Sequence, residues 1–177
     1  REMDLEAFRG FKSVNEIHFG PYSTIPDADS SSQGIFANCS NLRYIWIDTT
    51  AIGKYAFYGS VGLQLIVFNN NVEIIPEGAF AGCVNGNMTI VSTDSLEESW
   101  QNISGNKEFP SKLKKIGTYA FYNSASISGT LDFRKNIYLT EIGAYAFTGC
   151  RSIQNVILPS NTNFDRTSFE TSTSISQ

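Results

Sequence analysis

Hydrophobic residues along the chain recur in two alternating patterns. In the first, apolar residues lie three and then two positions apart, as in Leu42-x-x-Ile45-x-Ile47. Apolar residues two apart, with polar residues between them, predict a short strand that buries one of its faces. Related phrases begin at Val14, Leu63 and Ile153.

The second pattern follows a helical spacing. Ile142, Ala146, Phe147 and Cys150 fall at i, i+4, i+5 and i+8, which predicts one apolar face of a short helix or 3₁₀ turn. Two positions after most anchor phenylalanines stands a glycine or an asparagine, residues that tolerate a left-handed backbone and can end such a turn. These residues are Asn38, Gly59, Gly82, Asn123 and Gly149.

The anchor phenylalanines show how often the unit repeats. Most of them follow one another after 21 to 28 residues, whereas Phe121 follows Phe80 after 41. Such self-similarity predicts a solenoid of about six stacked units, because one unit cannot bury its apolar face alone. We expect one domain over residues 1–169, with insertions at about 20–34 and 92–108, and a flexible polar tail over 170–177. The anchors are Phe8, Phe36, Phe57, Phe80, Phe121, Phe147 and Phe169.

These phrases resemble the BspA-like leucine-rich repeat family. The segments "EIGAYAFTGCRSIQNVILPS" at 141–160 and "VEIIPEGAFAGC" at 72–83 carry the resemblance. It implies an α/β repeat fold, a right-handed leucine-rich-repeat solenoid with short strands on one face and short helices or 3₁₀ turns opposite. It also implies a surface or secreted protein of the kind found in mucosal anaerobic bacteria and some protist parasites, where some members act as adhesins.

Composition excludes some classes of protein. The 177 residues are 41% hydrophobic, which is too high for a disordered chain. The net charge is −4, whereas a nucleic-acid-binding protein needs a basic surface. No apolar run reaches the roughly 20 residues that span a bilayer, so we expect no membrane insertion in this segment.

Candidate chemical groups are few. Cys39, Cys83 and Cys150 occupy the same slot of different repeats, too far apart for a disulfide or zinc site, so we interpret them as small buried hydrophobes. His18 is the only histidine and points outward from a strand, without a nucleophile or second ligand nearby. We therefore expect no cofactor, no metal and no enzymatic activity.

Outward strand positions offer a more informative surface. Alternation places Tyr44, Trp46, Leu65 and Val67 side by side on one face, where they predict an exposed apolar patch for a partner. The alternatives are that a flank, an insertion or another copy of the chain covers the patch, or that it is ordinary surface. The other predicted outward pairs are Glu16/His18, Asn87/Thr89, Thr130/Asp132 and Asn155/Ile157.

The insertion at 92–108 has a helical pattern of its own. Asp94 and Glu97 fit a capping box, and Leu96, Trp100 and Ile103 follow at helical spacing. Either this amphipathic helix packs on the solenoid, or Trp100 contributes to a partner site.

The sequence thus predicts a non-catalytic recognition module, extracellular or at a cell surface. Our first hypothesis is adhesion to a protein ligand, either a host extracellular-matrix protein or a protein of another cell, through the strand face near Tyr44 and Trp46. Two alternatives stay open. One is glycan binding, with an aromatic ring stacked on a sugar, and the other is a structural spacer or self-association module without its own ligand.

Overall fold

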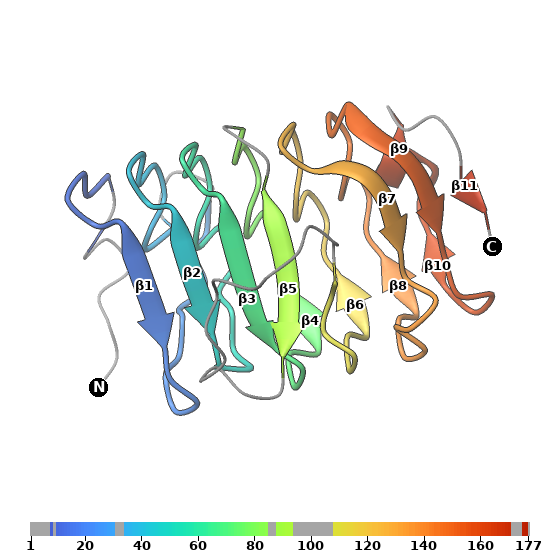
Figure 1. Ribbon diagram of the computed structural model, residues 1–177, viewed down its shortest axis with the longest axis horizontal. Helices are drawn as coiled ribbons and strands as arrows, with labels where there is room; N and C mark the ends of the chain where they lie inside the picture. Colours follow the sequence, from blue (N-terminus) through green and yellow to red (C-terminus); the bar gives the residue numbers. More distant parts are fainter. Residues whose placement is uncertain are drawn as a thin grey trace.

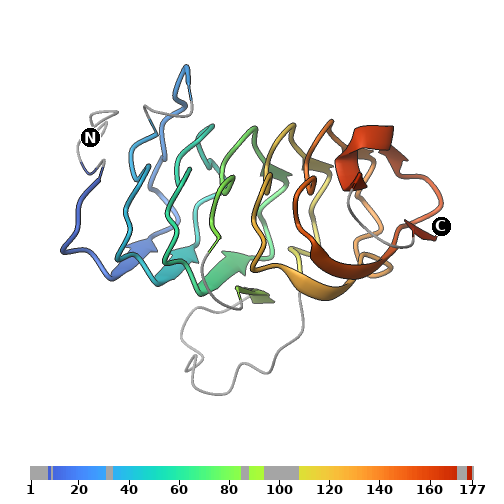
Figure 2. The ribbon, with the colours of Figure 1, turned by 90° about the horizontal axis from the view of Figure 1, so that it is seen from above.

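The chain winds into a solenoid of stacked coils, one coil for each sequence repeat (Figure 1). The computed structural model describes residues 8, 10–30, 34–84, 88–93, 108–170 and 175–176. Seen from above, the longer strands lie along one side of the stack and the turn segments along the other (Figure 2). We call the side formed by β1, β2, β3, β5, β7 and β9 the strand face.

The described residues form three parallel sheets, which run along the stack. Sheet A has the order β1 (Glu16–Phe19), β2 (Tyr44–Ile47), β3 (Leu65–Asn69) and β5 (Thr89–Thr93). Sheet C has the order β11 (Ile175–Ser176), β9 (Ser152–Ile157) and β7 (Ser128–Asp132). Sheet B consists of two-residue strands in the order β10 (Asn163–Phe164), β8 (Glu141–Ile142), β6 (Lys115–Ile116) and β4 (Ile74–Ile75).

The anchor phenylalanines form a continuous stack through the core. The rings from Phe8 to Phe169 lie nearly parallel, with neighbouring centroids 5.2 to 5.5 Å apart. Phe80 and Phe121 stack at 5.4 Å although 41 residues separate them in the sequence. The predicted column is therefore confirmed, and the extra residues between these two anchors do not interrupt it.

The half of each coil that was predicted as a short helix or 3₁₀ turn consists mainly of turns. Among the described residues, the only helical element is the 3₁₀ helix Arg166–Phe169. In the other coils successive N–H groups alternate between two kinds of partner. Ala56 N and Tyr58 N donate within their own turn, to Gly53 O and Tyr55 O, whereas Phe57 N and Gly59 N donate to Ala79 O and Ala81 O of the next coil. Because every second N–H group has its partner in the next coil, these turns do not continue into a regular helix.

Left-handed backbone marks these turns. Gly59, Gly82 and Gly149 have φ angles of 67°, 72° and 84°, as the sequence predicted for the position after each anchor. Three tyrosines also adopt a φ of 57°, which is uncommon for a bulky side chain. The rings of Tyr119 and Tyr145 stack 5.0 Å apart, a contact that offsets part of the backbone strain. The three are Tyr55, Tyr119 and Tyr145.

A second column consists of glycines at which successive coils touch backbone to backbone. A Cβ atom on Gly53 would lie 1.8 Å from Pro26 O, one on Gly117 2.6 Å from Glu77 N, and one on Gly143 2.6 Å from Thr118 N. No side chain fits at these distances. The Ile-Gly phrase of the repeat is therefore required by the close approach of neighbouring coils.

Part of the stretch predicted as an insertion at 20–34 follows the path of a coil. Ile25 and Ala28 are buried, and their N–H groups donate to Ala51 O and Lys54 O in the next coil. Residues 31–33 lie outside the described residues.

The strand face is interrupted between β5 and β7, which belong to different sheets. The two coils are joined where these strands begin, by a bond from Met88 N to Ser126 O. Farther along, the chain re-enters at Glu108, which donates to Ile90 O, and Phe109 enters the core with its ring 4.8 Å from that of Phe133. The re-entering residues Glu108 and Phe109 therefore lie between β5 and the segment that contains β7.

Candidate functional site

The outward side chains of sheet A form two rows across the strands. Parallel pairing aligns Glu16, Tyr44, Leu65 and Thr89 in one row. It aligns His18, Trp46, Val67 and Val91 in the other. The predicted outward pairs are confirmed in β1, β2 and β3, and the pairs Thr130–Asn155 and Asp132–Ile157 are aligned in sheet C.

The predicted outward pair Asn87/Thr89 is confirmed for Thr89, which aligns with Leu65. The other outward residue of β5 is Val91, which aligns with Val67. Asn87 lies outside the described residues. The loose phrase after Gly86 did not show where the strand begins.

The predicted apolar patch assembles, but it is buried rather than exposed. Trp46, Leu65 and Val67 are 3%, 7% and 3% exposed and form an apolar cluster separate from the core, with Tyr44 and Val91 packed at its margin. We call these five residues the outer cluster. The alternation of the strands gave the direction of each side chain correctly. It could not give the exposure, which depends on everything that surrounds a side chain in space.

His18 extends the outer cluster toward the first strand. Its ring stacks on Trp46, with centroids 4.3 Å apart and an angle of 15° between the planes. Its Nε2 lies 2.5 Å from Glu16 Oε1, and both side chains are about half exposed, at 58% and 46%. The exposed part of this surface is therefore a polar pair at the margin of a buried aromatic cluster.

Trp100, the remaining candidate, lies outside the described residues, as do the capping box and helix expected around it. The described chain leaves the strand face at Thr93 and returns at Glu108.

The three cysteines occupy the same position of different repeats and make the same kind of hydrogen bond. Cys39, Cys83 and Cys150 are buried, unpaired thiols, as predicted. Each donates to the carbonyl of the anchor phenylalanine in the preceding coil, as Cys150 Sγ does to Phe121 O at 3.1 Å. Burial raises the pKa of Cys83 and Cys150 to about 12 and also raises that of Cys39, so these thiols stay protonated and are poor nucleophiles.

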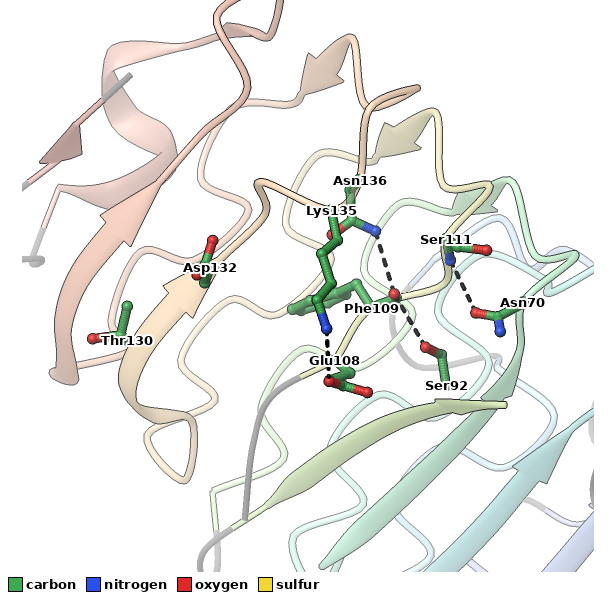
Figure 3. A pocket seen from close by; sticks show the side chains of 9 residues that line it. All are labelled: Asn70, Ser92, Glu108, Phe109, Ser111, Thr130, Asp132, Lys135 and Asn136. Atoms are coloured by element: carbon green, nitrogen blue, oxygen red, sulfur yellow. Dashed lines mark hydrogen bonds and ion pairs between the residues drawn. The ribbon is translucent and has the colours of Figure 1, made fainter. Parts of the chain in front are cut away.

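A cleft of about 480 Å³ opens where the strand face is interrupted (Figure 3). Thr130 and Asp132 of β7 lie on one side, with Ser92 of β5 and the re-entering Glu108 across from them. The ring of Phe109 lies between the two sides and is 5% exposed. The other lining residues are Asn70, Ser111, Lys135 and Asn136.

Most polar side chains of this cleft already have partners. The guanidinium of Arg134 binds both carboxylate oxygens of Asp132 and lowers the pKa of that carboxyl. Lys135 Nζ lies 3.6 Å from Glu108 Oε1, and the Asn136 amide donates to Pro110 O at 2.7 Å. The cleft is polar but its charges are balanced.

Comparison with known proteins places this architecture in a family. Residues 1–103 and 96–177 match the BspA type leucine rich repeat region, in six copies. The chain belongs to this family. A search of curated proteins finds no match.

One solved structure of a leucine-rich repeat protein shares the fold, and two others align with the chain at lower scores. A T. pallidum leucine-rich repeat protein aligns with a TM-score of 0.50 and 21% identity, covering 85% of this chain and 50% of that one. A Bacteroides ovatus leucine-rich repeat protein aligns with a TM-score of 0.49 and 24% identity, covering 86% of this chain and 42% of that one. A Faecalibacterium prausnitzii leucine rich cell surface protein aligns with a TM-score of 0.45 and 16% identity, covering 97% of this chain and 62% of that one. The chain thus spans about half the length of these proteins.

The match to leucine-rich repeats indicates a repeat module of a class that generally binds proteins, and no enzyme family is indicated. Within the described ranges, no three His, Cys, Asp or Glu side chains gather as a metal site would require. The described residues also contain no helix of the length and apolarity needed to span a membrane.

Sequence reasoning missed the cleft. The available signal was the gap of 41 residues between Phe80 and Phe121, which shows where the repeat is interrupted. It did not show that Phe109 would enter the core there, because a phenylalanine after a polar insertion fits a loop equally well.

Proposed function

We propose that this leucine-rich repeat chain is a non-catalytic recognition module, secreted or exposed at a cell surface, that binds a protein ligand through its strand face. The ligand would be a host extracellular-matrix protein or a protein of another cell, so that binding results in adhesion. Family membership supports the recognition role, and the surface of sheet A supports the location.

The observation that carries this proposal is the outer cluster. The corresponding outward positions of β7 and β9 include the exposed residues Thr130, Asp132 and Asn155, whereas sheet A has aromatic and aliphatic residues there. Aromatic side chains in rigid surroundings dominate the binding free energy of many protein interfaces. Trp46 and its neighbours would form the rigid base of the site, and the half-buried Tyr44 with His18 and Glu16 its accessible margin.

The test is binding of the purified chain to immobilised fibronectin, fibrinogen and mucin glycans. The Tyr44→Asp variant places a charge at the margin of the outer cluster without removing the buried Trp46. Tyr22→Asp is the matched control, because Tyr22 is 98% exposed in a loop beyond β1. We expect saturable binding to a protein, weakened at least about tenfold by Tyr44→Asp and unchanged by Tyr22→Asp.

Other results would favour the alternatives. Binding to mucin glycans alone, competed by free sugar, would replace the protein ligand by a carbohydrate. No binding to any surface, together with a solution mass that rises with concentration, would indicate a self-association module.

A further inference from the structure

We propose that the edge of β7 facing the cleft is a docking site for an extended peptide segment of a partner protein, which pairs with β7 as an added strand. The inference rests on the proposed function, since it takes the ligand to be a protein. It goes further in naming a second site on the strand face and the mode of binding.

The hydrogen bonds of β7 show which backbone groups point toward the cleft. Phe133 N donates to Ile157 O of β9. In a parallel strand, each residue directs its N–H and C=O toward the same neighbour, and successive residues alternate between the two sides. Leu131 and Phe133 therefore face β9, whereas the N–H and C=O groups of Thr130 and Asp132 face the cleft. No strand among the described residues pairs with this edge.

The opposite wall follows the same rule. Thr89 N donates to Gln64 O, so that Thr89 faces sheet A and its neighbour Ile90 faces away from it. Glu108 N donates to Ile90 O, so that the re-entering chain lies beside β5 where the cleft begins. Beyond this bond the re-entering chain bends into the core at Phe109, and the space beside β7 stays open (Figure 3).

The chemistry of the cleft favours a peptide over a charged small molecule or a sugar. Asp132 is held by Arg134, Glu108 lies near Lys135, and the Asn136 amide is bound to backbone carbonyls, so the side chains offer few unused partners. A ligand gains most from the backbone groups of β7, which are the groups that an added strand satisfies. The volume of about 480 Å³ is in the range of ordinary ligand sites.

Two exposed apolar side chains follow the cleft residue Asn136 in the sequence. The loop that follows the cleft residues exposes Ile137 and Tyr138, which are 62% and 54% exposed. Alternate side chains of an added strand point to opposite faces, so that one set would contact the Phe109 side of the cleft and the other would face outward. We expect the preferred peptide to alternate apolar with polar residues.

The first experiment uses the intact chain and short overlapping peptides that tile fibronectin and fibrinogen. Each peptide that binds is then resynthesised with a single N-methyl group moved along its backbone. Strand addition predicts an alternating result, in which methylation at every second residue weakens binding at least about tenfold and methylation between them does not. Equal effects at successive positions, or none, would overturn the proposal.

A pair of variants tests the same edge from the protein side. Thr130→Pro removes the N–H that faces the cleft and leaves the bond from Phe133 to β9 in place. Thr130→Ala is the matched control, because it removes the hydroxyl and keeps the N–H. We expect Thr130→Pro to lose peptide binding and Thr130→Ala to keep it, with equal far-UV circular dichroism. If Thr130→Pro does not fold, the methyl scan on the unaltered chain decides.

The outcomes separate this proposal from the proposed function. Binding of an intact protein that depends on Tyr44, with no peptide bound at the cleft, would overturn strand addition and leave recognition in place. Failure to bind any protein or peptide would overturn both. A sugar whose binding is lost in Thr130→Pro would assign the cleft to a carbohydrate and overturn the peptide.

Discussion

Sheets A and C lie on the same side of the solenoid but present different surfaces. In sheet A, Trp46, Leu65 and Val67 form a buried apolar cluster on the outer side. In sheet C, outward residues such as Asp132 and Asn155 are exposed and polar. On the inner side the two sheets are alike, because the phenylalanine stack passes beneath both.

The difference separates two roles within each repeat. Inward positions contact the same positions of the coils on either side, so each must match its neighbours, and the repeat phrase is kept. Outward positions have no such partner in the core. They can differ from coil to coil without disturbing the stack, and recognition by a solenoid is therefore expected where the outward positions depart from a common pattern.

The largest expected effect tests whether the core is continuous across the interruption. Phe80→Ala and Phe121→Ala, on either side of the break, should each lower the free energy of unfolding by about 3–5 kcal/mol, as for large buried side chains elsewhere. Phe57→Ala, well inside sheet A, is the reference. Urea denaturation would show the change, and a much smaller loss for Phe80 and Phe121 than for Phe57 would mean that the break reaches the core.

A pH-dependent effect should arise in both regions, because Cys83 precedes the break and Cys150 follows it. Burial raises the pKa of both thiols to about 12, compared with about 8.5 in an unfolded chain. Above about pH 8.5 the unfolded chain releases protons that the folded chain retains. The free energy of unfolding should therefore fall by up to about 1.4 kcal/mol per pH unit for each thiol, until the pH approaches 12.

Serine variants isolate this effect. Ser60 and Ser124 already occupy the same slot in other coils and donate to Phe36 O and Phe80 O, so Cys83→Ser and Cys150→Ser should fold. Each substitution should remove the contribution of one thiol to the alkaline dependence in urea titrations at pH 7.5 to 9.5 (about two pH units). An unchanged slope in the double variant would show that these two thiols are not the cause.

The smallest expected effect compares the outer sides of the two sheets directly. Val67→Ala removes two buried methyl groups and should cost about 1.5 kcal/mol. Thr130→Ala, at an exposed outward position of β7, should stay within about 0.5 kcal/mol of the unaltered chain. Thermal unfolding of both variants measures the difference. Equal stability would mean that the outer cluster adds nothing to the fold.

The sequence predicted the core because its anchors repeat. The phenylalanine column and the strands that follow each anchor could be located from spacing alone, including the neighbours Phe80 and Phe121. The turn half was predicted as a short helix or 3₁₀ turn. The sequence did not show that Tyr55 and Tyr119 adopt a left-handed backbone that their residue type disfavours, or that their N–H groups bond to other coils. The spacing of apolar residues within one repeat does not show hydrogen-bond partners that lie in another coil.

The sequence predicted which side chains of the candidate site lie next to one another, but not how much of each is exposed to water. Alternation placed Tyr44 and Trp46 beside Leu65 and Val67, and parallel pairing confirms that arrangement. Whether such side chains meet water depends on what surrounds them in space. The cleft could not be found for a similar reason, because it results from Phe109 entering the core after an insertion of no repeat character.

The glycine column has a mechanical consequence. At Gly53, Gly117 and Gly143 the coils approach more closely than any side chain allows. Along this line the backbones limit how closely neighbouring coils can approach. A single methyl group there would push two coils apart, and every coil beyond them would be displaced with the second. The relative placement of the strands on the strand face therefore depends on residues that lie outside it.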